Sequence, residues 1–274
     1  MIMHGQESVP SILEAAARGE TAGIFADIRK VLGSSVVNLI WRHLATMPGA
    51  LPWTWSTVRP LYLGAAPGHA ESVRRTIVLP ELPGFSADTM LAAGIDESDK
   101  AIIGHVLDSY QHTNALALVV LSALLAHYEP HPADVVTAAG SAPPPARVKI
   151  PELPPMDALD PEVARLVAEL NGFGEDAQPQ LIASMYRHLG YWPSYLALVR
   201  TLLAPPQADG RLLALTNATR ALGRAHGQML AAQLNPSAPP DTLNGVLASC
   251  RLFVEHPIAR MTGLCALIRR ATPA

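Results

Sequence analysis

The chain has 274 residues, of which 49% are hydrophobic and only 16% are charged, and its formal net charge is −3. This composition excludes a wholly disordered chain, because disorder requires low hydrophobicity and high charge. It also gives no electrostatic basis for binding nucleic acid, since twenty basic residues face twenty-three acidic ones and no basic block occurs.

Helical periodicity begins close to the N-terminus, in residues 22–33. The apolar residues of this segment recur three and four positions apart, on one face of a helix: Ile24, Phe25, Ile28, Val31 and Leu32. Gly33 follows them and suits a left-handed cap at the end of that helix. Similar patterns fill most of the chain, and no convincing alternating strand occurs.

The longest apolar run, residues 115–126, is interrupted by Ser122 and followed by His127. A membrane span needs about 20 apolar residues, so we expect a buried helix here. Residues 1–8 have neither a basic start nor a hydrophobic core, so we expect no export signal. Cys250 and Cys265 form neither a redox pair nor a metal set. These features predict a cytoplasmic protein.

Twenty-five prolines, about twice the usual share of roughly 5%, organise the rest of the chain. Asp160-Pro161-Glu162 is a typical helix start, and Pro239-Pro240-Asp241 predicts a second start before a helix over 243–253. Prolines are therefore expected to separate helices. Residues 129–160 contain eight prolines and predict an extended connector between two helical halves. The fold class predicted is all-α.

Three sequence patterns recur in the same order in both halves. They are an aromatic residue with Arg-His-Leu and a later Pro and Leu (41–51 and 186–196), Val-Arg-x-Leu (58–61 and 199–202), and Leu-x-Ala-Leu (121–124 and 264–267). Such repetition favours duplication.

The duplication predicts one compact unit with four parts. They are an N-terminal segment over 1–21, a first helical repeat over 22–128, the Pro-rich linker over 129–160 and a second repeat over 161–274. Two similar units can pack as an internal pseudo-dimer, and a ligand site is then expected between them.

The motifs of several enzyme classes are missing: there is no phosphate-binding glycine loop and no nucleophile elbow. His43 and His188 are equivalent in the two repeats, and duplicated packing alone explains such a pair. Alternatively, His188 has a role of its own, because it lies on one helix face with Ser184 and Met185.

Asn114 lies in an otherwise apolar helical segment, with His112 two residues before it. A buried amide without a partner costs on the order of 1–3 kcal/mol. Asn114 therefore either ties down a neighbouring helix or lines a polar pocket and holds a water or a ligand.

Several segments, in the same order, resemble the group I 2-haloacid dehalogenases, which act on D- and L-2-haloacids. The similarity covers roughly residues 22–272. The segments are Ile28-Arg29, Arg42, Leu44 to Pro52, Ala93-Gly94-Ile95-Asp96, Asn114, Ala183-Ser184, Trp192-Pro193 and Gly245-Val246-Leu247.

The resemblance implies an all-α pseudo-dimer and direct hydrolysis without a cofactor or a metal. In that family an Asp activates the water that attacks C2 of the acid and displaces halide with inversion, and an Asn helps to hold the water. The Asn of the family falls on Asn114, and the Ser that directly precedes the Asp falls on Ser184. The Asp itself falls on Met185. A thioether cannot accept a proton at any relevant pH.

Other family positions are also altered. Aromatic residues of the family's pocket fall on Val36 and Leu39, and a tyrosine falls on Cys250. The resemblance therefore implies a pocket with smaller and less aromatic walls. Ser184 and Met185 are also expected to line this pocket.

Three interpretations follow. The protein is a hydrolase with a substitute base, His188 or His112; or it has another chemistry on a small carboxylic acid; or it only binds a ligand or has no catalytic role. We expect a small carboxylic acid as ligand, no nucleic-acid or membrane partner, and a homodimer as one candidate assembly.

Overall fold

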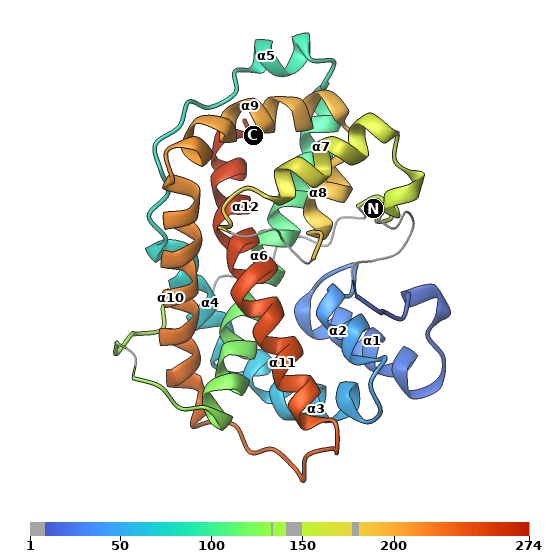
Figure 1. Ribbon diagram of the computed structural model, residues 1–274, viewed down its shortest axis with the longest axis vertical. Coiled ribbons are helices and arrows are strands. Elements are labelled where there is room, and N and C mark those ends of the chain that lie inside the picture. Colours follow the sequence, from blue (N-terminus) through green and yellow to red (C-terminus); the bar gives the residue numbers. More distant parts are fainter. Residues whose placement is uncertain (1–8, 133, 141–149, 177–180, 274) are drawn as a thin grey trace.

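The computed structural model describes residues 9–132, 134–140, 150–176 and 181–273. Within these ranges the chain is helical and contains no strand, so the predicted all-α class is confirmed (Figure 1). Part of the predicted N-terminal segment (1–8) and part of the predicted linker (133 and 141–149) lie outside the described residues.

The first half of the chain ends in a very long helix. Its elements are η1 (Glu14–Ala16), α1 (Gly19–Leu32), α2 (Leu39–Leu44), α3 (Ala50–Leu63), α4 (Ala66–Thr76), α5 (Ala87–Ala92) and α6 (Glu97–Tyr128). The apolar run over 115–126 lies inside α6 and is almost entirely buried.

The second half is also helical throughout its described elements. They are η2 (Met156–Ala158), α7 (Pro161–Asn171), α8 (Ser184–Leu189), α9 (Pro193–Ala208), α10 (Arg211–Ala231), α11 (Leu243–Phe253), the π-helical turn η3 (Val254–Ile258) and α12 (Ala259–Ala271). The division into repeats over 22–128 and 161–274 stays a prediction.

Helix α6 is the centre of the molecule, and α4, α10, α11 and α12 pack against it. Figure 1 shows α10, α11 and α12 running alongside α6, with α1 and α2 at one end of a shared side and α7 and α8 at the other. A capping box starts α6: the Asp99 backbone N–H donates to Asp96 Oδ1 (2.9 Å), and the Asp96 N–H donates to Asp99 Oδ2 (3.4 Å).

Glycines allow α10 to approach α6 closely. A Cβ added at Gly227 would lie 2.6 Å from the backbone carbon of Ser122 and 2.9 Å from the nitrogen of Ala123. At Gly223 it would lie 2.6 Å from a methyl carbon of Leu118. Because side chains do not tolerate such distances, the sequence of α10 sets how near the two longest helices lie.

The predicted helix ends are largely confirmed. Gly33 closes α1 with φ 67°, and the Asp160 side chain accepts a hydrogen bond from the Glu162 N–H at the start of α7. Helix α11 begins at Leu243 as expected, but its N-cap is Thr242, which makes no side-chain cap.

The expectation that prolines only separate helices is wrong at several positions. Pro60 lies inside α3, Pro205 and Pro206 inside α9, and Pro257 inside η3. A proline within a helix removes one backbone hydrogen bond. Tertiary packing outweighs that loss where the helix is buried on one face, and the wider π-helical turn accommodates Pro257.

No described helix is both long enough and apolar enough to cross a membrane. The apolar content instead serves a continuous core around α6 that includes residues of both halves.

Candidate functional site

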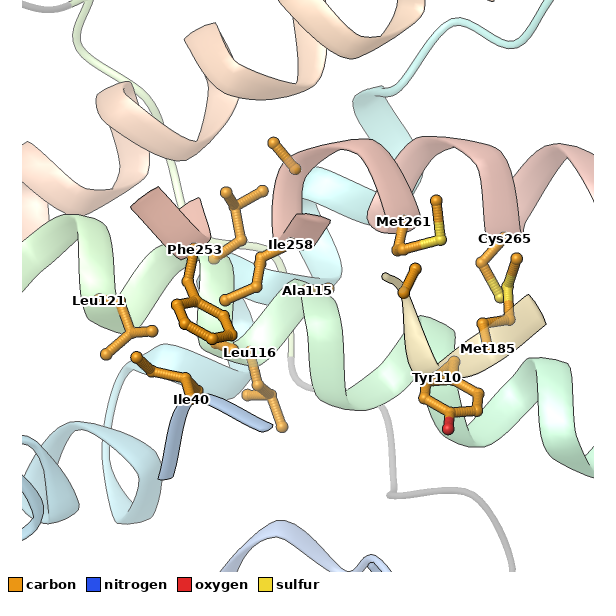
Figure 2. Packing of buried hydrophobic residues seen from close by; sticks show 14 of the residues in the cluster. Ile40, Tyr110, Ala115, Leu116, Leu121, Met185, Phe253, Ile258, Met261 and Cys265 are labelled. Carbon is orange, nitrogen blue, oxygen red and sulfur yellow. The ribbon is translucent and has the colours of Figure 1, made fainter. Parts of the chain in front are cut away.

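A cavity of about 940 Å³ lies between the two halves. Side chains of α2, α6, α8, η3 and α12 line it, together with the segments around Pro10 and Pro155. Figure 2 shows part of its wall, where Tyr110 and Met185 lie near Met261, and Ile40, Phe253 and Ile258 form a second group.

Six of the eight predicted site residues line this one cavity: Val36, Leu39, Asn114, Ser184, Met185 and His188. They come from three separate parts of the chain, which the packing of α2, α6 and α8 brings together. Their individual roles stay predictions.

His112 and Cys250 are not among the lining residues. His112 Nε2 lies 3.0 Å from the Leu32 carbonyl oxygen and donates to it, which ties α6 to the end of α1. Cys250 is fully buried, and burial raises the pKa of its thiol to about 12. The proposed roles of both residues therefore gain no support from their positions.

His188 has a defined tautomer. Its Nε2 lies 2.9 Å from the Pro151 carbonyl oxygen, which can only accept, so the proton is on Nε2. Its Nδ1, 2.7 Å from the Tyr110 hydroxyl, then accepts the Tyr110 proton. Burial lowers the pKa of His188 to about 4, so the ring is neutral at pH 7.

The Tyr110 side chain lines the cavity and is hydrogen-bonded to His188. Burial raises the pKa of its phenol, while the nearby charges of Arg187 and Arg42 and a hydrogen bond from Ser184 act to lower it. Ser184, Tyr110, His188 and the Pro151 carbonyl thus form one chain of hydrogen bonds that starts at the cavity wall.

Arg42 and Arg187 are 5% exposed, line the cavity and occupy equivalent positions in the two predicted repeats. Arg42 Nε donates to the Val37 carbonyl at 3.3 Å, and Arg187 Nη2 donates to the Pro154 carbonyl at 2.7 Å. Both guanidinium groups lie close enough to Tyr110 to favour negative charge at its oxygen.

Asn114 is 93% buried, since its exposed fraction is 7%, and it lines the cavity one helical turn after Tyr110. No other described residue forms a hydrogen bond with its side chain. A buried amide needs a partner, and because Asn114 lines the cavity, a water or ligand bound there can supply one.

Met185 is fully buried from bulk solvent and lies on the cavity wall between Ser184 and the core. It offers the cavity a thioether, a weak acceptor without acid–base function. Among the described residues, no group of three or more His, Cys, Asp or Glu side chains is placed to hold a metal ion.

The π-helical turn η3 contributes Pro257 and Ile258 to the cavity wall. A buried charge cluster supports this turn: Glu175 lies 2.8 Å from Arg220 Nη2, 3.4 Å from His256 Nδ1 and 3.7 Å from Arg260 Nη1. π-helical turns within α-helices occur often at functional sites.

Sequence reasoning missed Tyr110, Arg42 and Arg187 as site residues. A signal for each was present, because Tyr110 precedes Asn114 by one helical turn and the two arginines are equivalent in the recurring Arg-His-Leu pattern. The Pro151 and Pro154 carbonyls were also missed, since residues 150–155 belong to the predicted connector.

Solved structures of D-2-haloacid dehalogenase are similar to the whole chain. A mutant and a complex with L-LA each have a TM-score of 0.74 and 16% identity, covering 99% of this chain and 98% of the other. A mutant complex with D-2-CPA has a TM-score of 0.66 and 18% identity, covering 97% of both chains. No family model and no curated protein sequence matches the chain. The chain thus has the fold of D-2-haloacid dehalogenases with a strongly diverged sequence.

Proposed function

We propose that the cavity binds a small carboxylic acid and that the protein is a 2-haloacid dehalogenase-like hydrolase, acting by attack of water at C2. The observation that carries this proposal is the convergence of Asn114, Ser184, Tyr110 and His188 on one cavity in a chain with this fold.

The acid is held by positive charge. The carboxylate lies near Tyr110 and Ser184, in the field of Arg42 and Arg187. Two acidic residues also line the cavity, but Glu14 binds Arg29 and the Val37 N–H, and Glu152 is exposed to solvent. The inner cavity therefore favours an anion.

The attacking water is held by Asn114, whose amide has no other partner among the described residues. The water oxygen bonds to C2 as halide leaves with the bonding electron pair. One water proton passes to the Tyr110 oxygen while the Tyr110 proton passes to His188 Nδ1, 2.7 Å away. The products are the 2-hydroxy acid and halide, and His188 then releases the proton to solvent.

His188 is a weak base for this purpose. With a pKa of about 4 it is neutral at pH 7 but resists protonation. A well-tuned base contributes typically 10²–10⁴-fold to such a step. His188 also reaches the water only through Tyr110, whereas a carboxylate at position 185 would accept the proton directly. We therefore expect turnover well below that of an enzyme with a carboxylate at position 185.

Binding without hydrolysis is the second candidate function. Met185 favours it, because a thioether at the position where the family has its water-activating Asp leaves a pocket that binds an acid without activating water. A related alternative is different chemistry on a small carboxylic acid in the same cavity.

Chloride release separates these candidates. The full chain is incubated with D- and with L-2-chloropropionate, and free chloride is compared with a heat-inactivated control. Release above the control supports the hydrolase, and its absence with both enantiomers overturns it. A rise in the unfolding temperature with the same acids, but without chloride release, identifies a binding protein.

Met185→Asp tests the importance of the missing carboxylate. If the rest of the cavity is competent, chloride release should appear or rise about 10²-fold or more. Met185→Asn is the matched control, because it introduces a polar side chain of the same size without a base. Equal rates in the two variants, both folded by circular dichroism, would contradict this expectation.

A further inference from the structure

Two related ring pairs of different chemistry contribute to the cavity wall, one through Tyr110 and His188 and the other through Phe253. Tyr110 and His188 lie edge to face with ring centroids 5.6 Å apart, and Phe253 stacks on His43 with centroids 5.9 Å apart. Each histidine also bonds a proline carbonyl: His43 Nδ1 lies 2.8 Å from Pro10 O, as His188 Nε2 lies near Pro151 O. Each histidine thus lies between an aromatic ring and a proline carbonyl.

The residues around the two pairs differ in polarity. Counting back from the shared Arg-His-Leu pattern, Ser184 is equivalent to Leu39 and Met185 to Ile40. Around Tyr110 the cavity therefore has hydroxyl groups, whereas Leu39, Ile40, Phe253 and Ile258 present hydrocarbon to it. Figure 2 shows this second group, with Phe253 beside Ile40 and Ile258 and apart from Tyr110 and Met185.

The cavity is also much larger than a two- or three-carbon acid requires. Its volume of about 940 Å³ lies at the upper end of the range of roughly 300–1,000 Å³ that is typical of sites for much larger ligands. An acid of three carbons bound at Tyr110 would leave the apolar half empty of substrate.

We propose that the apolar half, formed by Leu39, Ile40, Phe253 and Ile258, binds a hydrocarbon chain, so that the protein selects medium-chain carboxylic acids over three-carbon acids. The carboxylate lies at the Tyr110 end, near Arg42 and Arg187, and the chain extends towards Phe253. The proposal rests on the proposed function only in assigning the carboxylate to the Tyr110 end.

Calorimetric titration of the full chain with propionate, butyrate and hexanoate tests this proposal without requiring hydrolysis. Each added methylene buried in the apolar half should tighten binding by up to about fourfold, so hexanoate should bind at least tenfold more tightly than propionate. A hexanoate affinity equal to or below that of propionate, or no binding of any of these acids, overturns the proposal.

Leu39→Trp tests where the chain binds. Leu39 is half-buried on the cavity wall, so an indole there fills the apolar half, and the ratio of hexanoate to propionate affinity should fall towards one. Leu63→Trp is the matched control, because Leu63 is 61% exposed and does not line the cavity. This variant should keep the ratio, and a ratio unchanged in Leu39→Trp would overturn the assignment.

Ile258→Phe provides a second variant in case Leu39→Trp fails to fold, and it should lower the same ratio. Failure of the proposed function is recognised separately. Absence of chloride release from 2-chloropropionate, together with tighter binding of hexanoate, removes the hydrolase and keeps the chain-length selectivity. Chloride release together with binding that does not depend on chain length keeps the hydrolase and removes the chain-length selectivity.

Discussion

Tyr110 and His188 form a hydrogen-bonded pair at the cavity. His188 itself does not face an incoming ligand with a free lone pair, because its Nδ1 accepts the Tyr110 proton and its Nε2 proton is held by Pro151. Tyr110 is therefore the group through which His188 can act on a ligand. The sequence pointed to His188, and only the contact across 78 residues identifies its partner.

Tyr110→Phe should lower chloride release about 10²-fold or more, because it removes the hydroxyl group that joins the cavity to His188. His188→Ala should abolish the release for the same reason. Tyr195→Phe is the matched control, since Tyr195 is also buried and its hydroxyl also has a partner at 2.7 Å, Thr272, outside the cavity. Full activity in His188→Ala would remove His188 as the base.

The pH dependence of chloride release follows from the state of His188. Burial lowers its pKa to about 4, so above that pH the imidazole is neutral and can act as a base. The rate should rise as pH increases through about 4 and stay level from about pH 5 to 8. Initial rates in buffers of constant ionic strength measure this profile, and an acidic limb near pH 6.5 would show that a histidine of ordinary pKa is the base.

At the scale of elements, close packing of helices holds the residues of the site in position. Asn114 and Tyr110 lie on α6, and α10 holds α6 in place through glycines that allow near contact. The helix ends at Gly33 and Asp160 were predictable because caps are local. The π-helical turn at Pro257 was not, because the Glu175 cluster beside it joins residues that lie far apart in the chain.

Gly227→Ala should lower the free energy of unfolding by about 2–3 kcal/mol, because the new methyl group meets the Ser122 backbone at 2.6 Å and the helices must separate. Gly23→Ala in α1 is the matched control. Gly23 is exposed with nothing within 4 Å, so alanine there should raise the stability by up to about 1 kcal/mol. Urea unfolding measures the free energy of unfolding of both variants. Changes of the same size and sign in the two variants would contradict the packing argument.

At the scale of the whole molecule, buried neutral histidines link stability to pH. Burial lowers the pKa of both His188 and His226 to about 4, and His226 Nδ1 lies 2.8 Å from His69 Nδ1 between α4 and α10. In the unfolded chain these groups titrate near 6.5. Between pH 6.5 and 4 the unfolded state therefore binds more protons than the folded state, and stability falls as the pH is lowered through this window.

The expected slope approaches two protons, or about 2.7 kcal/mol per pH unit, below pH 6. Urea unfolding at pH 7.5, 6.0 and 5.0 measures it. His226→Gln should reduce the slope by about one proton, because it removes one of the two strongly shifted groups. A stability that does not change between pH 7.5 and 5.0 would show that neither histidine is kept neutral by burial.

The sequence by itself determined the helical class, the positions of most helices and the residue types available for chemistry, because periodicity, caps and composition are local properties. It also determined that position 185 is a methionine, whose thioether cannot act as a general base. It failed where a contact overrides a local preference, as at the prolines inside α3 and α9.

Only the tertiary structure decided which residues share the cavity. It placed Asn114, Ser184, Met185 and His188 together, excluded His112 and Cys250 from the wall, and added Tyr110 and two arginines. The physical reason is that hydrogen bonds such as Tyr110–His188 join residues far apart in the chain, and their burial depends on how the helices of both halves pack around α6.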